Sequence, residues 1–161
     1  MSNAIVVRNL WKSYSAGVRG CSARVWVLRG CSLLVQQGER VGVVGARASG
    51  KSTLLQCLAG DRRPDAGHVE VAASIRRPPL GISGPEVFSG RRTPNELWLL
   101  DDDEHAFLHT CVAGSLIVFT GDAARVSSGV DRLLLLRDGH LTPITRLVAR
   151  RVAERVAAPA R

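Results

Sequence analysis

The chain has 161 residues, a hydrophobic content of 45% and a formal net charge of +8. This composition excludes an intrinsically disordered chain and fits one domain that can bury a core. All 22 basic residues except Lys12 and Lys51 are arginine, but no dense basic block with interleaved aromatic residues occurs, so the sequence disfavours a nucleic-acid partner.

The cysteines and the apolar segments exclude several other classes. No C-x-x-C pair occurs, so the sequence indicates neither a zinc site nor a redox pair. The N-terminus lacks the apolar stretch of a signal peptide. The longest apolar runs, such as residues 133–136, are too short to span a bilayer. We therefore expect a cytoplasmic protein that reaches a membrane only through a partner.

The elements expected in chain order alternate between strands and helices. Strands are predicted at 4–8, 24–36 (one or two strands), 40–45, 68–74, 96–100, 115–120 and 131–136. Helices are predicted at 51–59, 103–114 and 122–129, and residues 76–85 read as a loop. Thr142 and Pro143 indicate the start of a basic amphipathic C-terminal helix. This alternation predicts a parallel sheet that is covered on both faces.

The most specific motif is Gly45-x-x-x-x-Gly50-Lys51-Ser52, which lies between a predicted strand and a predicted helix. Such a loop directs backbone N–H groups at an anion, its lysine reaches phosphate oxygens, and the serine hydroxyl helps to hold Mg²⁺. The predicted phosphate site comprises Gly45, Ala46, Arg47, Ala48, Ser49, Gly50, Lys51, Ser52 and Thr53. A positive φ at Ala48, where this motif usually has glycine, costs about 1–2 kcal/mol.

Residues 3–71 resemble the N-terminal half of the nucleotide-binding domain of ATP-binding cassette (ABC) proteins, a clearer match than the later segments give. The resemblance implies an α/β P-loop NTPase with a mainly parallel sheet and an N-terminal antiparallel β-layer. It also implies ATP and Mg²⁺ as cofactors. Tyr14 falls where the family stacks an aromatic residue on adenine, although a tyrosine half-buried in a loop is the alternative.

The segment after residue 95 resembles the family's Walker B region in part. Asp101 ends an apolar strand and matches the residue that holds Mg²⁺ through water. Asp102 stands where the family has a catalytic glutamate, and its shorter side chain makes hydrolysis slower. Glu104 is a potential substitute. The family's switch histidine is replaced by Gly121. His105 and His109 have the spacing of two metal ligands on a helix, but no third ligand accompanies them.

The segment between Lys51 and Asp101 is far shorter than in the family, which implies that the helical subdomain is largely deleted. No glutamine follows Gln56, and residues 82–86, "ISGPE", favour a plain helix start over a relic of the signature segment. The single domain then divides into four parts. A β-layer and P-loop half (1–75) is followed by a contracted helical region (76–94), a Walker B half (95–145) and a C-terminal basic helix (146–161).

These features predict an ABC-type ATP-binding protein that hydrolyses ATP slowly, or only with a complete partner subunit. Lys51 and Asp102 are its expected catalytic residues. The resemblance implies a second ABC subunit and a membrane permease as partners, which would place the protein at the periphery of the inner membrane. Three alternatives remain: a non-catalytic regulatory module, a basic nucleic-acid-associated protein, and the product of a decayed gene.

Overall fold

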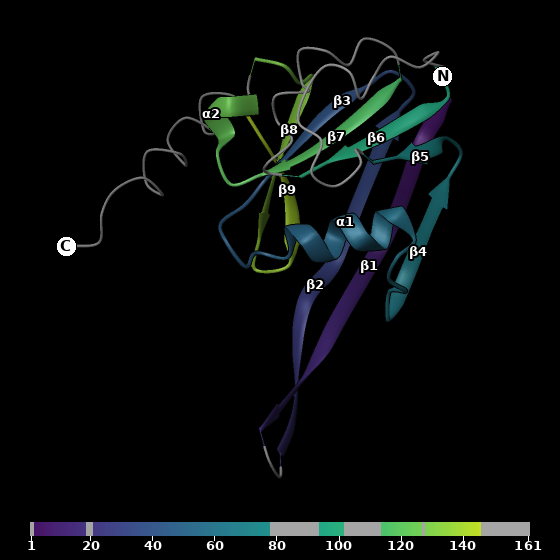
Figure 1. Ribbon diagram of the computed structural model, residues 1–161. Coiled ribbons are helices and arrows are strands. Elements are labelled where there is room, and N and C mark those ends of the chain that lie inside the picture. Colours follow the sequence, from purple (N-terminus) through teal and green to yellow (C-terminus); the bar gives the residue numbers. More distant parts are fainter. Residues whose placement is uncertain (1, 19–20, 78–93, 102–113, 127, 146–161) are drawn as a thin grey trace, which may run out of the picture.

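A computed structural model describes residues 2–18, 21–77, 94–101, 114–126 and 128–145 (Figure 1). Two helices occur in these ranges, α1 (Lys51–Ala59) and α2 (Ala123–Val126). The strands are β1 (Asn3–Val18), β2 (Cys21–Gln36), β3 (Arg40–Val44), β4 (Ala66–Val71), β5 (Ser74–Arg76), β6 (Glu96–Leu100), β7 (Ser115–Thr120), β8 (Arg132–Arg137) and β9 (His140–Ile144). No helix among the described residues is long and apolar enough to cross a membrane.

The N-terminal sheet is antiparallel, with the strand order β2-β1-β4. Strands β1 and β2 form a hairpin that pairs from Asn3 with Gln36 to Val18 with Cys21. Strand β4 pairs with β1 only between Ile5 and Trp11, so the outer part of the hairpin has no third strand. This part projects from the body of the molecule (Figure 1).

The second sheet has the order β5-β6-β7-β3-β8-β9. All its neighbouring strands are parallel except β8 and β9, which are antiparallel. The mainly parallel sheet and the N-terminal antiparallel layer are therefore confirmed. Only residues 77–95 connect β5 to β6, a length that leaves no room for a large helical subdomain.

The main core lies between the two sheets and α1. Alternate residues of β1 and β2 face this core because successive side chains of a strand point to opposite faces. Fully buried side chains from both sheets and α1 meet there, including Ile5, Leu28, Val43, Leu54, Leu58, Leu99 and Phe119. A smaller apolar cluster on the other side of the parallel sheet joins Val44, Leu100, Leu116, Val118, Ala123, Val126, Val130 and Leu133.

Several sequence-based boundaries differ from the structure. The strand predicted at 68–74 is divided between the two sheets, since β4 ends at Val71 and β5 begins at Ser74. The N-terminal strand reaches Val18, since cross-strand pairing with β2 extends it far beyond residues 4–8. The predicted helix at 122–129 is confined to α2. The prediction that a helix starts at Thr142 is wrong. Both Thr142 and Pro143 belong to β9, where Thr142 pairs with Leu135 and Pro143 pairs with Leu134. Proline is compatible with an edge strand, where it need not donate a hydrogen bond. The helix predicted at 103–114 and the C-terminal helix at 146–161 lie outside the described residues.

Asp65 holds the segment before β4 against β1. Its carboxylate accepts hydrogen bonds from Lys12 Nζ at 2.8 Å and from Ser13 N and Oγ at 2.7 and 2.6 Å. The hydrogen bond from Lys12, followed by those from Ser13, keeps the pKa of Asp65 well below its usual value. A carboxyl group with a lowered pKa stabilises the fold above its unfolded-state pKa of about 4, and this contribution is lost as the pH falls below that value.

We predict that Asp65→Asn lowers the free energy of unfolding at neutral pH by about 2 kcal/mol, because charge-assisted hydrogen bonds are lost. Urea denaturation at pH 7 and at pH 3 measures the effect, and the deficit should shrink at the lower pH. The control is Asp61→Asn, which removes an exposed ion pair with Arg77 and should cost less than about 0.5 kcal/mol. Equal losses in the two variants would contradict the assignment.

Candidate functional site

The phosphate loop of residues 45–50 joins the carboxyl end of β3 to α1. Strand β3 lies between β7 and β8, and Gly45 N donates to Thr120 O at 3.1 Å, which fixes the start of the loop against the end of β7. A Cβ atom at Gly45 would lie 2.8 Å from Leu136 O and would also meet the Ser49 side chain. Glycine is required at Gly45 because of this close approach.

Lys51 begins α1 and turns its side chain into the loop. The residue is 8% exposed, and its Nζ donates to Gly45 O at 2.8 Å and to Ala46 O at 3.1 Å. The first N–H groups of a helix have no intrahelical acceptor, and the N-terminus carries a partial positive charge. The loop therefore gathers an ammonium group and helix N–H donors at one place, which suits an anionic ligand.

Two further features of the loop fit a phosphate site. Ser49 Oγ is buried and has no hydrogen-bond partner among the described residues, and a buried hydroxyl in this state is costly unless a ligand or water satisfies it. Ala48 has a φ of 63°, so the left-handed conformation considered from the sequence is observed. The loop thus keeps a strained alanine where glycine would be relaxed.

Tyr14 lies beside the first turn of α1. Its hydroxyl is 3.2 Å from Thr53 Oγ1, so the structure brings together two of the sequence-predicted site residues. The Arg62 guanidinium lies 5.2 Å from the centre of the Tyr14 ring and Lys12 Nζ lies 5.7 Å from it. Sequence inspection did not single out Arg62, and its position after the end of α1 gave no signal of contact with β1.

Asp101 follows the carboxyl end of β6, at the same edge of the sheet as the phosphate loop. Leu100 pairs with Val118 on β7, and Val118 pairs with Gly42 on β3, so Asp101 is level with Val43. One strand separates β6 from β3, which places them about 10 Å apart. Ser52 is exposed on the first turn of α1. Asp102 and Glu104 lie outside the described residues.

The turn after β7 is built without the family's histidine. Thr120 Oγ1 accepts a hydrogen bond from Asp122 N at 3.0 Å, and Asp122 Oδ1 accepts one from Ala124 N at 2.9 Å, which caps α2. Gly121 between them has no side chain for proton or hydrogen-bond chemistry. Among the described residues no cluster of three metal-ligating side chains occurs, and His105 and His109 lie outside these residues.

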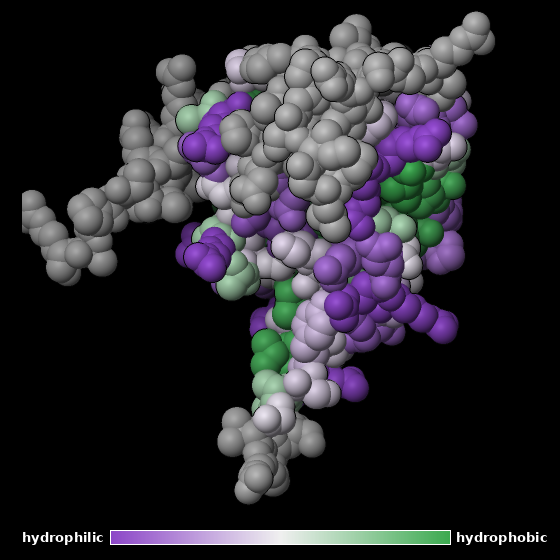
Figure 2. Space-filling view, viewed as in Figure 1, coloured by the Kyte–Doolittle hydropathy of each residue, from purple (hydrophilic) through white to green (hydrophobic). Residues whose placement is uncertain are grey.

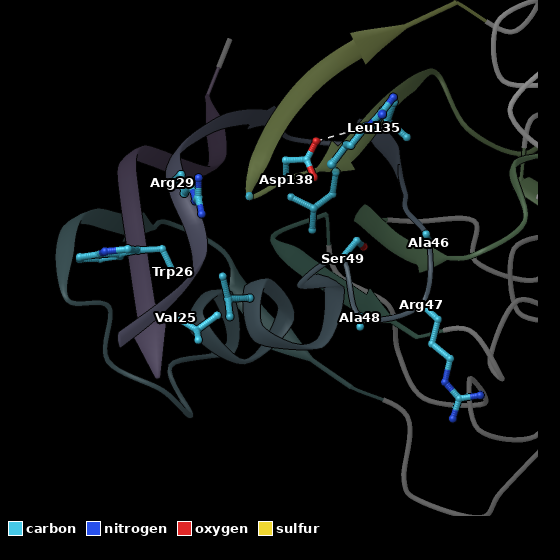
Figure 3. A pocket seen from close by; sticks show the side chains of 13 residues that line it. Val25, Trp26, Arg29, Ala46, Arg47, Ala48, Ser49, Leu135 and Asp138 are labelled. Carbon is cyan, nitrogen blue, oxygen red and sulfur yellow. Dashed lines mark ion pairs between the residues drawn. The ribbon is translucent and has the colours of Figure 1, made fainter. Parts of the chain in front are cut away.

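A pocket of about 780 Å³ lies on one side of the loop (Figure 3). Loop residues Ala46–Ser49 form one wall, and residues 25–27 and Arg29 of β2 lie opposite, with residues 135–139 between them. Figure 3 shows the Trp26 ring and the Arg47 side chain extending away from each other. Neither Tyr14 nor Lys51 lines this pocket, so the predicted nucleotide residues and the pocket share only the loop.

Comparisons with known proteins show what this chain is similar to. The family model "ABC transporter" matches residues 28–102. The lipoprotein-releasing system ATP-binding protein LolD of Saccharophagus degradans is 49% identical over 63 residues, which are 39% of this chain and 26% of that protein. The methionine import ATP-binding protein MetN of Bordetella avium is 40% identical over 88 residues, which are 55% of this chain and 22% of that protein. The chain thus spans about a quarter of the length of these curated relatives.

Solved structures show the same fold. An ATP-binding subunit of an ABC transporter superposes with a TM-score of 0.66 at 15% identity, over 96% of this chain and 95% of that chain. A dimeric ATP-binding cassette bound to ADP and phosphate gives a TM-score of 0.65 at 14% identity, over 88% of this chain and 98% of that chain. The chain therefore has the fold of the nucleotide-binding domain of ABC transporters, which it resembles in a shortened form.

The conformation of Ala48 yields a test within the loop itself. We predict that Ala48→Gly leaves the free energy of unfolding unchanged or raises it by up to about 1 kcal/mol, because relief of the left-handed strain offsets the added backbone entropy. The matched change Ala46→Gly, at a residue without a positive φ, should lower stability by about 0.5–1 kcal/mol. Chemical denaturation measures both, and a larger loss for Ala48→Gly would refute the strain.

Proposed function

We propose that this chain is an ABC-type ATP-binding module whose phosphate loop holds the β- and γ-phosphates of Mg-ATP. The observation that carries the proposal is the buried Lys51 ammonium, which lies at 2.8 Å from Gly45 O at the N-terminus of α1. An ammonium group beside the N–H groups of a helix N-terminus suits a phosphate, because both present positive charge to the ligand. The orphan hydroxyl of Ser49 supports the same ligand.

Each residue of the proposed site has a distinct task. Lys51 exchanges its carbonyl partners for phosphate oxygens, and the backbone of residues 45–53 surrounds the phosphate chain. Ser52 and Asp101 are the proposed Mg²⁺ ligands, Asp101 through water. Mg²⁺, when bound, supplies charge that neutralises the phosphate oxygens. The ring of Tyr14 offers a π-face to adenine, next to the phosphate loop.

Turnover is proposed to be slow. Asp102 is the proposed base, one methylene shorter than glutamate, and loss of a well-placed base costs about 10²–10⁴-fold in rate. Gly121 offers no side chain where the resemblance implies a histidine. We therefore favour a weak ATPase, or one that needs a complete second ABC subunit. The alternative favoured by Gly121 is a non-catalytic nucleotide-binding module that regulates a partner.

The partners follow from the relatives by analogy. LolD and MetN are named as ATP-binding proteins of lipoprotein release and methionine import. We propose that this chain likewise works in the cytoplasm with a membrane permease. The short connection between β5 and β6 supports a docking mode different from that of a protein with a full helical subdomain.

Lys51→Ala should abolish micromolar binding of Mg-ATP, because it removes the cation that faces the phosphates. Isothermal titration calorimetry measures binding, and phosphate release under excess ATP measures turnover. Arg125→Ala, a change on α2, is the control and should bind as the wild type does. If the Lys51→Ala variant and the wild type bind ATP equally, the proposed site is wrong. If the wild type binds ATP but releases no phosphate, the regulatory alternative is correct.

Tyr14→Ala should weaken ATP binding about tenfold and leave inorganic triphosphate binding unchanged, since it removes only the contact to the base. Tyr14→Phe keeps the π-face and loses the hydroxyl contact with Thr53, so it should bind ATP nearly as well as the wild type. Competition titrations with ATP and triphosphate compare the three proteins. An equal loss for both ligands would show that Tyr14 supports the loop structurally instead of stacking on adenine.

A further inference from the structure

The projecting part of the β1–β2 hairpin has an unusual charge. Residues 1–38 contain no aspartate or glutamate, whereas arginines and one lysine are spread along this segment. Beyond Trp11 the hairpin lacks the support of β4, and residues 15–17 and 23–25 are exposed. In Figure 2 apolar side chains gather along this projecting part, and Val25 is 50% exposed. The surface is thus basic and apolar at once.

Two tryptophans from opposite strands meet on this hairpin. The rings of Trp11 and Trp26 lie edge to face with their centres 5.5 Å apart, and both residues are half-buried. Asn9 accepts a hydrogen bond from Trp11 Nε1 at 2.9 Å and has a φ of 48°, a left-handed conformation that asparagine adopts more readily than most residues. The Asn9 side chain therefore fixes the orientation of an aromatic ring.

Arginines flank this pair of rings. The Arg24 guanidinium lies 5.8 Å from the centre of the Trp26 ring, and Arg29 pairs in register with Trp11. Both arginines are exposed. Lys12 does not belong to this basic surface, because its ion pair with Asp65 neutralises its charge. Asp138 lines the pocket with Trp26 and Arg29 and forms an ion pair with Arg137.

We propose that Trp11, Trp26, Arg24 and Arg29, here named the hairpin strip, bind single-stranded nucleic acid. Unpaired bases stack on aromatic rings while phosphates contact arginines, and this combination needs no base-specific contact. An acidic peptide matches the charge but not the oriented indole rings, and a duplex hides the faces of its bases. The pocket beside Trp26 adds room for a base. The proposal does not rest on ATP binding, since none of the four residues lies in the phosphate loop, although loop residues Ala46–Ser49 form the opposite wall of this pocket.

The test uses the full chain without ATP and a fluorescein-labelled oligothymidylate or oligouridylate of about 20 nucleotides. Fluorescence anisotropy at several salt concentrations yields the affinity and the slope of log K against log salt. We expect Trp26→Ala to weaken binding about tenfold with little change in the slope. Arg24→Gln should lower the magnitude of the slope by about 0.7, the value for one phosphate contact on a single strand.

Arg125→Gln, which removes the same charge at α2, is the matched control and should leave the affinity and the slope unchanged. Because Arg24 is exposed, its variant tests the proposal even if Trp26→Ala does not fold, which circular dichroism will report. The proposal is overturned if the wild type does not bind the oligonucleotide or if a duplex of the same sequence binds equally well. It is also overturned if the Arg24 and Arg125 variants behave alike, or if vesicles of anionic phospholipid bind in place of the oligonucleotide.

Discussion

The position of β3 between β7 and β8 determines where the phosphate loop can lie. Parallel neighbours on both sides bury this strand completely from Val41 to Val44, so its carboxyl end is fixed by two hydrogen-bonded ladders. The bond from Gly45 N to Thr120 O continues the ladder by one residue into the loop. Any change that shifts β7 along β3 therefore displaces the loop as well, and with it the first turn of α1.

Inside the loop, hydrogen bonds hold the buried side chain of Lys51. A buried ammonium group is expensive unless hydrogen bonds satisfy it, and the carbonyl groups of Gly45 and Ala46 supply them. A phosphate that binds to Lys51 would replace these contacts. The net free energy gained is then the difference between the Lys51–phosphate and the Lys51–carbonyl interactions. The strained Ala48 and the unsatisfied Ser49 hydroxyl show that the loop is not arranged for stability alone.

The parts of this molecule that were predictable from sequence are those set by local pattern. The apolar run of β3, the motif from Gly45 to Ser52 and the helix that ends at Gly60 follow from short-range rules. The length of the hairpin was not predictable, because β1 and β2 stabilise each other through cross-strand pairs. The contact between Tyr14 and Arg62 also depends on the fold, and so does the meeting of Trp11 with Trp26.

The C-terminal end of β9 illustrates the same limit from the other direction. Thr142 and Pro143 have the local chemistry of a helix start, yet pairing with β8 places them in a strand. Local propensity differs by a few tenths of a kcal/mol per residue, and tertiary pairing overrides it. The charge distribution, by contrast, was fully visible in the sequence, but only the folded hairpin shows which aromatic side chains accompany it.

The two outer strands of the parallel sheet have a consequence for how the protein associates with others. Strand β5 is only three residues long and carries Arg76, whose side chain reaches Glu96 of β6. At the opposite edge, Pro143 lacks the N–H group that an incoming strand would need. Short, charged and proline-containing edges discourage the addition of a further strand. Among the described residues, both edges of this sheet are thereby unfavourable for self-association by sheet extension.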